Sequence, residues 1–297
     1  MTLLAAAGPA AADEPRPGIL LLAHGGSAKW NDSVRALAAK VDLQQPTEVA
    51  FGMASRPAIQ SAVDRLVERG ASAIVAVPLF VSSHSSVISS TEYLLGLRSE
   101  APADLAVFAR MNGHGLAEAG HHEAGEADNA KPIQSAVPIR IAPALGHHTV
   151  VSDILLTRAT AISHDPSEEA LVLVAHGPVP EEDNRAWLAD MAVVAGRIRE
   201  NMPFASVDWL TVRDDAPAPI RDAATAELRA VVQRRTAEGR RLLVVPLVIS
   251  FGGIEAGIRK RLEGLGYTMA EQGLMPDDRL AGWVLEMAAA AIVRPTQ

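Results

Sequence analysis

The sequence predicts an α/β fold of two similar, doubly wound parallel-sheet domains with a cleft between them. The first observation is an apolar run ending in Ala-His-Gly, which occurs at residues 20–25 and again at 172–177. The second is Val-Pro-Leu inside an apolar strand, at residues 77–79 and again at 245–247. The third is an amphipathic helical stretch that precedes each Val-Pro-Leu strand. Because this order of strands and helices occurs twice, we expect a duplicated α/β unit.

The elements of each half follow from the periodicity of their apolar residues. The first run of each half is continuously apolar, as expected of a strand buried on both faces of a parallel sheet. In the first half we expect further strands at 48–52 and 73–81 and a helix at 58–70; the equivalent segments of the second half are 207–212, 242–249 and 220–239. Each half ends in a loop followed by a helix, at 145–156 and at 274–285.

The chain divides into a leader and two domains. Residues 1–17 form the leader, residues 18–164 the N-terminal domain and residues 168–293 the C-terminal domain. The boundary lies near the Asp-Pro-Ser sequence at 165–167, which is typical of a turn. The first half also contains an insertion at about 98–136, which is rich in Gly, Ala, His and Glu and is predicted to be a mobile surface loop.

The leader permits two interpretations. Leu3, Leu4 and the alanines that end before Asp13 suit the end of a signal peptide with a small-residue cleavage site, whose start would lie upstream of Met1. No Lys or Arg precedes Arg16, however, so this sequence lacks the positive start of such a peptide. The alternative is a disordered Ala-rich leader. The signal-peptide interpretation implies that the protein is exported.

The composition excludes several classes of protein. The net charge is -8 and Lys and Arg form no cluster, so binding of nucleic acid is not expected. The absence of cysteine excludes disulfides, iron–sulfur clusters and thiolate catalysis. No run of about 18 apolar residues predicts a membrane span. The missing G-x-G-x-x-G, Gly-Lys-Ser/Thr and G-x-S-x-G motifs argue against dinucleotides, nucleoside triphosphates and α/β-hydrolase chemistry.

Two histidines stand where a parallel sheet binds its ligands. His24 ends the first strand of the first half, and His84 follows the third strand. Ligands bind at the carboxyl ends of parallel strands, so both imidazoles are expected to face one cleft. Two imidazoles that leave positions open on the metal suit Co²⁺, Fe²⁺ or Ni²⁺. His24 recurs as His176, so a role in the fold is the alternative for His24, whereas the residue equivalent to His84 is Gly252.

Five further histidines are candidates for metal binding. His147 and His148 precede the last helix of the first half, where the positive end of the helix dipole favours neutral imidazole. An ordinary surface position is the alternative for both. His114, His121 and His122 lie in the insertion and form a flexible candidate site for a divalent metal, with a loop that binds nothing as the alternative.

Taken together, these motifs resemble the sirohydrochlorin chelatases, the class II tetrapyrrole chelatases, in their tandem two-domain form. The resemblance rests on the two Ala-His-Gly strands, on Val-Pro-Leu-Phe at 77–80 and on Leu-Gly-x-His at 145–148, and it covers roughly residues 18–290. It implies insertion of Co²⁺ or Fe²⁺ into sirohydrochlorin without ATP and without a tightly bound cofactor. It also implies a cytoplasmic pathway, leading to cobalamin or siroheme.

The resemblance assigns roles to residues. His24 corresponds to the catalytic histidine of the first strand and His84 to the second catalytic histidine, which in relatives lies further from the proline of the strand. His148 corresponds to a position at the rim of the site. Sirohydrochlorin is a polycarboxylate, so Arg56 and Arg213, each just beyond the second strand of its half, are candidates for binding its carboxylates. Ordinary surface arginines are the alternative.

Two other functions stay open at this point. One is an exported metal- or tetrapyrrole-binding protein that keeps the fold without turnover, which the leader and the insertion histidines favour. The other is a hydrolase that uses His-Gly-Gly as its oxyanion loop, which the missing nucleophile motif disfavours. The sequence also leaves open which metal and which tetrapyrrole bind, and whether the chain forms a homodimer.

Overall fold

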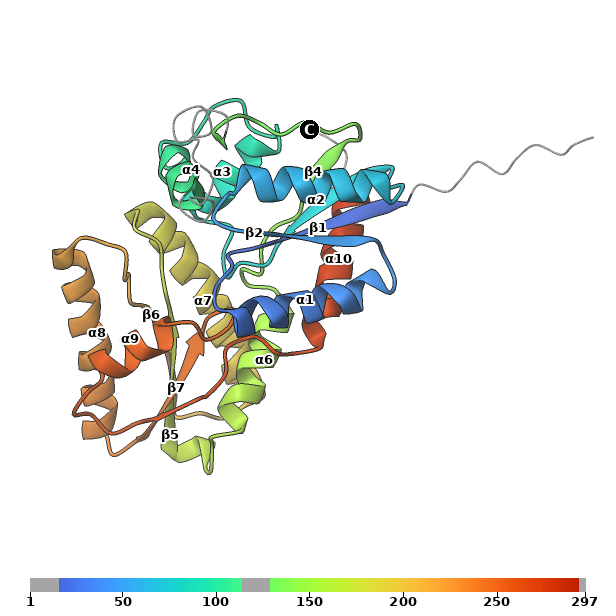
Figure 1. Ribbon diagram of the computed structural model, residues 1–297. Helices are drawn as coiled ribbons and strands as arrows, with labels where there is room; N and C mark the ends of the chain where they lie inside the picture. The colour runs from blue at the N-terminus through green and yellow to red at the C-terminus, as the bar shows by residue number, and fades with distance from the viewer. Residues whose placement is uncertain (1–15, 114–128, 294–297) are drawn as a thin grey trace, which may run out of the picture.

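The computed structural model describes residues 16–113 and 129–293, which contain two parallel four-stranded sheets (Figure 1). The strand order is β2-β1-β3-β4 in the first sheet and β6-β5-β7-β8 in the second. All neighbouring strands within them are parallel. The predicted fold of two doubly wound parallel sheets is therefore confirmed.

The two halves have the same order of strands. The first half consists of β1 (Pro17–Ala23), α1 (Ala28–Asp42), β2 (Thr47–Phe51), α2 (Arg56–Glu68), β3 (Ala73–Pro78), α3 (Ser86–Leu94), α4 (Leu105–Gly113), β4 (Ile139–Ile141) and α6 (Thr149–Thr160). A 3-10 turn at Pro166–Glu168 leads into the second half, which consists of β5 (Glu169–Ala175), α7 (Glu181–Asn201), β6 (Ser206–Thr211), α8 (Ala218–Ala237), β7 (Arg241–Leu247), α9 (Ile254–Arg261), β8 (Thr268–Met269) and α10 (Arg279–Val293).

Alternation of side chains along the central strands separates three apolar cores. In β1, Ile19 and Leu21 point to one face of the sheet and Leu20 points to the other. In β5, Leu171 and Leu173 join the same cluster as Ile19 and Leu21. The inner faces of both sheets thus share one core, and each outer face packs against its own cluster. The continuous apolar runs in the sequence reflect this burial on both faces.

The last helix of each half crosses to the sheet of the other half. α10, at the end of the second half, packs on α1, β3 and β4 of the first half. α6, at the end of the first half, packs on α7 and β7 of the second half. In Figure 1 the red α10 lies beside the blue elements of the first sheet, and the green α6 lies near β7. Because of this exchange, each half covers part of the inner face of the other half's sheet.

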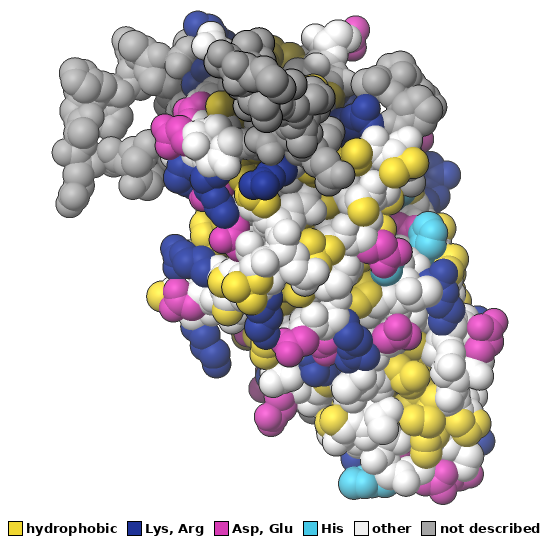
Figure 2. Space-filling view, turned by 90° about the vertical axis from the view of Figure 1, so that its right-hand side faces the viewer, with side chains coloured by type: hydrophobic (Ala, Val, Ile, Leu, Met, Phe, Trp, Pro, Cys, Tyr) yellow, Lys and Arg dark blue, Asp and Glu magenta, His cyan; other side chains and the backbone are white. Residues whose placement is uncertain are grey.

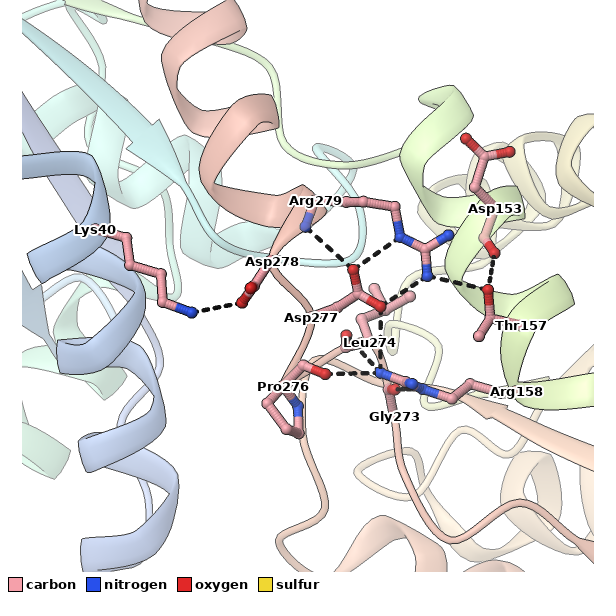
Figure 3. Close-up of polar contacts among 10 residues, drawn as sticks. All are labelled: Lys40, Asp153, Thr157, Arg158, Gly273, Leu274, Pro276, Asp277, Asp278 and Arg279. Atoms are coloured by element: carbon pink, nitrogen blue, oxygen red, sulfur yellow. Dashed lines mark hydrogen bonds and ion pairs between the residues drawn. The ribbon is translucent and has the colours of Figure 1, made fainter. Parts of the chain in front are cut away.

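The loop that leads into α10 is held by a side chain of the first half (Figure 3). Arg158 of α6 donates a hydrogen bond to the carbonyl oxygen of Pro276 at 2.8 Å. Asp277 accepts hydrogen bonds from the Arg279 guanidinium, and these lower the pKa of its carboxyl below the ordinary value against the opposing effect of burial. The junction between the halves therefore contains a fixed ionic network as well as apolar contacts.

The insertion of the first half is held against α2 where it returns to the sheet. The side chain of Gln60 accepts from the backbone N–H of Gln134 and donates to its carbonyl oxygen, both at 2.8 Å. The predicted surface loop contains the helix α4, and its central residues 114–128 lie outside the described residues.

No helix in the described part of the chain is long and apolar enough to cross a membrane. On the face shown in Figure 2, acidic and basic side chains lie interspersed among apolar and uncharged ones.

Candidate functional site

His24 lies directly after β1, at the carboxyl edge of the first sheet, and its side chain is exposed. Its Nδ1 lies 2.5 Å from the carbonyl oxygen of Gly25. A carbonyl oxygen can only accept, so Nδ1 carries the hydrogen, and the neutral ring has an unprotonated Nε2. A nitrogen in this state can bind a metal ion or accept a proton. The tautomer that this contact favours suits the predicted role of His24, which stays a prediction.

The turn that carries His24 is fixed by its neighbours. Gly25 has a φ of 84°, in the left-handed region that glycine adopts without strain. The N–H of Gly26 donates to the Asn31 side chain at 2.9 Å. The Trp30 ring lies edge-on to the His24 ring, with 6.5 Å between the ring centroids. His24 is therefore an exposed imidazole on a defined support.

His84 lies in the loop after β3, and its side chain is also exposed. Its backbone N–H donates to the Ser82 hydroxyl at 3.1 Å, and Ser83 accepts from the backbone N–H of Ala144 at 2.9 Å. β1 and β3 are neighbouring parallel strands, so His24 and His84 leave the same edge of the sheet. No hydrogen bond or ring contact joins these two described side chains, and their sharing one metal ion stays a prediction.

His176 has the same place in the second half as His24 in the first, but its environment differs. Its Nε2 lies 3.3 Å from a carboxylate oxygen of Asp215. The carboxylate is an acceptor, so Nε2 of His176 faces a group to which it can donate. The two rings thus direct different nitrogens at their nearest polar neighbour, Nδ1 in His24 and Nε2 in His176. Sequence reasoning missed Asp215, which lies in the loop after β6 and carries no local motif.

His147 and His148 lie where the first half meets the second. Nδ1 of His148 accepts from the backbone N–H of Val150 at 3.2 Å and caps α6, while its Nε2 lies 3.4 Å from Glu286 of α10. Nδ1 of His147 is 2.6 Å from Asp190 of α7. Both ring contacts cross between the halves. These carboxylates were also missed, because they lie far away in the sequence and only the helix exchange brings them near.

The two arginines predicted to bind the substrate differ in their hydrogen-bond partners. Arg56 begins α2, and its Nε donates to the carbonyl oxygen of Lys131, in the segment that closes the insertion. Arg213 is buried, with a side chain only 7% exposed. It donates to the carbonyl oxygen of Val179 and to the Glu181 carboxylate, both at 2.5 Å. This geometry favours a role for Arg213 in holding the loop after β5, rather than the predicted contact with a substrate.

The insertion histidines His114, His121 and His122 lie outside the described residues. Among the described residues, no group of three or more His, Asp or Glu side chains is arranged to hold a metal ion. Most coordination positions of a metal ion bound to His24 would therefore be filled by water, by His84 or by another ligand. Such a weak site suits an ion that is handed on rather than stored.

The family of the first half is decided by a sequence match. Residues 18–162 match the model of the CbiX family. The first half is a CbiX domain. The family resemblance predicted from the sequence is confirmed by this match, and His24, His84 and His148 all lie inside the CbiX domain. No curated protein matches the chain in sequence.

The CbiX domain and the second half together share their fold with solved chelatase structures. SirB from Bacillus subtilis with Fe3+ matches with a TM-score of 0.61 and 17% identity over 93% of this chain and 97% of that chain. SirB from Bacillus subtilis subspecies spizizenii in complex with cobalt matches with a TM-score of 0.57 and 15% identity, over 93% and 95%. CbiX, described as the terminal enzyme for siroheme biosynthesis in denitrifying bacteria, matches with a TM-score of 0.53 and 16% identity. The match covers 92% of this chain and 99% of that chain.

Proposed function

We propose that this protein is a chelatase that inserts a divalent metal ion, Co²⁺ or Fe²⁺, into sirohydrochlorin or a related tetrapyrrole without ATP. The observation that carries the proposal is the exposed imidazole of His24 at the carboxyl edge of a CbiX domain, with Nδ1 against the Gly25 carbonyl oxygen. The solved structures of the same fold support it, because two of them contain iron or cobalt and a third is a siroheme enzyme.

The reaction needs a group that first binds the ion and then accepts a proton. As a divalent ion enters the macrocycle, the macrocycle loses two N–H protons. His24 Nε2 binds the ion in our proposal and is released when the ion moves to the pyrrole nitrogens. The released nitrogen then accepts one proton, and solvent accepts the other. Because Nδ1 stays bonded to the Gly25 carbonyl, the ring keeps its orientation throughout.

His84 is proposed as the second ligand of the incoming ion. It leaves the strand next to that of His24, and its exposed side chain has no partner that would hold it elsewhere among the described residues. Imidazole ligands suit Ni²⁺ as well as Co²⁺ and Fe²⁺, so the choice of ion is a matter for measurement.

The test is absorbance of sirohydrochlorin with purified protein and Co²⁺ or Fe²⁺, compared with the metal-only rate. For His24→Ala we expect a loss of about a hundredfold or more in rate, and for His84→Ala a loss of about tenfold. The matched control is His176→Ala, because His176 has the same place in the fold but its Nε2 faces Asp215. We expect that control to keep most of the activity.

Two results would contradict the proposal. Equal losses in His24→Ala and His176→Ala would mean that both histidines act through the fold. Binding of metal and tetrapyrrole by the wild-type protein without acceleration would instead favour the binding protein without turnover.

A further inference from the structure

An exposed glycine of the second half, Gly252, lies beside the support of His24. Gly252 and Gly253 follow β7, and a Cβ built on Gly252 would lie 3.8 Å from Cδ1 of Trp30, with no other heavy atom within 4 Å. Trp30 is the residue whose ring stands edge-on to His24. The indole therefore bridges the His24 turn of the first half and the glycine loop of the second.

Backbone conformation explains why Gly253 is a glycine, but it does not explain why Gly252 is one. Gly253 has a φ of 135°, which a residue with a side chain rarely adopts. Gly252 has no such conformation, so a residue with a side chain would fit its backbone. The fold therefore does not require the missing side chain at Gly252. A glycine of this kind is typical of a place where another molecule approaches the backbone closely.

The glycine loop is held in place, which a contact surface requires. The carboxylate of Glu255 accepts from the N–H of Gly252 at 3.1 Å and from the N–H of Gly253 at 2.9 Å. The equivalent loop of the first half carries His84 at the position of Gly252. The register supports this equivalence, because the two loops make the same backbone contacts with the segments after β4 and β8.

We propose that Gly252 contributes to tetrapyrrole binding at the His24 site by letting a flat macrocycle approach closely. This inference rests on the proposed function. The bare backbone of Gly252 and Gly253 forms the part of the surface that faces the edge of the tetrapyrrole while His24 transfers the ion. Transfer requires the pyrrole nitrogens to come within about 2 Å of the ion that His24 holds. A side chain at Gly252 would project into this space and keep the ring away.

The test is Gly252→Leu, with sirohydrochlorin binding followed by absorbance and Co²⁺ binding measured on the same preparations. We expect a sirohydrochlorin Kd about tenfold or more higher than in the wild type, with Co²⁺ affinity unchanged because His24 is untouched. The matched control is Gly266→Leu. Gly266 is also exposed, has no heavy atom within 4 Å of its built Cβ and lies just before β8, at the opposite edge of the sheet.

The outcomes separate this inference from the proposed function. Unchanged sirohydrochlorin binding in folded Gly252→Leu, or an equal loss in Gly266→Leu, overturns the inference and leaves the proposed function standing. Absence of sirohydrochlorin binding in the wild type overturns both. Should Gly252→Leu fail to fold, Gly252→Ala replaces it. Its Cβ makes only an ordinary van der Waals contact with Trp30, and we expect a Kd rise of about twofold to threefold.

Discussion

The His-Gly turns after β1 and β5 have the same sequence and the same place in the fold, but they present opposite nitrogens. His24 bonds through Nδ1 to its neighbouring carbonyl and leaves Nε2 unprotonated. His176 directs Nε2 at the carboxylate of Asp215. The comparison teaches that a duplicated motif need not be a duplicated site. The partner that each ring meets in the folded chain decides which copy can bind a metal ion.

The glycines of the two turns differ as well, although both have left-handed backbone. A Cβ on Gly177 would lie 2.4 Å from the Cβ of Thr211, whereas a Cβ on Gly25 would lie 3.6 Å from that of Phe51. The second turn is therefore packed tightly against the neighbouring strand, and the first has room. The looser turn is the one that carries the proposed metal ligand.

The largest expected effect in this comparison is on stability. Gly177→Ala should lower the free energy of unfolding by about 2–5 kcal/mol, from left-handed strain together with the clash against Thr211. Gly25→Ala should cost only about 1–2 kcal/mol, because strain acts there without a clash. Urea unfolding of both variants measures the difference. Equal losses would show that backbone strain alone determines both effects.

A second, smaller effect separates anchoring from substrate binding at Arg213. Arg213→Ala leaves the carbonyl oxygen of Val179 and the Glu181 carboxylate without their donor, and should lower the free energy of unfolding by about 1–3 kcal/mol. In the folded variant we expect sirohydrochlorin affinity to stay within about twofold of the wild type. A tenfold loss of affinity without a loss of stability would restore the predicted contact with a substrate carboxylate.

The sequence was sufficient to predict β1, β3, β5 and β7, because each is an apolar run buried on both faces and repeated in the same order. β2 and β6 were predicted from their place in that order, whereas the two short strands β4 and β8 were not predicted. The sequence could not predict the exchange of α6 and α10. Apolar residues show that a helix is buried, but they do not show which sheet buries it. The carboxylates beside His147 and His148 were missed for this reason, since Asp190 and Glu286 reach them only across the exchanged helices.

The site was predictable in part. His24 could be placed at a sheet edge, because its strand ends at His-Gly. Which of its nitrogens carries hydrogen depends on the turn made by Gly25, and the state of His176 depends on Asp215 in another loop. Arg213 was predicted to bind a substrate carboxylate, with an ordinary surface arginine as the alternative. Only the folded chain shows that its guanidinium meets the carbonyl oxygens of the loop after β5.

The smallest expected effect on stability concerns the residues that precede the two exchanged helices. His148 precedes α6, and Asp277 has the equivalent position before α10. Hydrogen bonds from Arg279 lower the pKa of Asp277 below its ordinary value of 3.8. The ionised Asp277 carboxylate therefore contributes its full stabilisation at a pH above the pKa of the unfolded chain. This contribution is lost as the pH falls through the lower pKa that Asp277 has in the folded protein. Asp277→Asn should reduce the free energy of unfolding by about 1 kcal/mol near pH 7, and urea unfolding near pH 3 should show a smaller difference.

The neighbouring Asp278 provides the control for this pH dependence. Its side chain is 87% exposed and its partner Lys40 is exposed too, so this ion pair should contribute little. Asp278→Asn is expected to change the free energy of unfolding by less than about 0.5 kcal/mol at either pH. If both variants behaved alike, general charge rather than the Arg279 contact would explain the effect. A difference confined to Asp277 would show that the second half fixes its exchanged helix with a half-buried carboxylate where the first half uses a histidine.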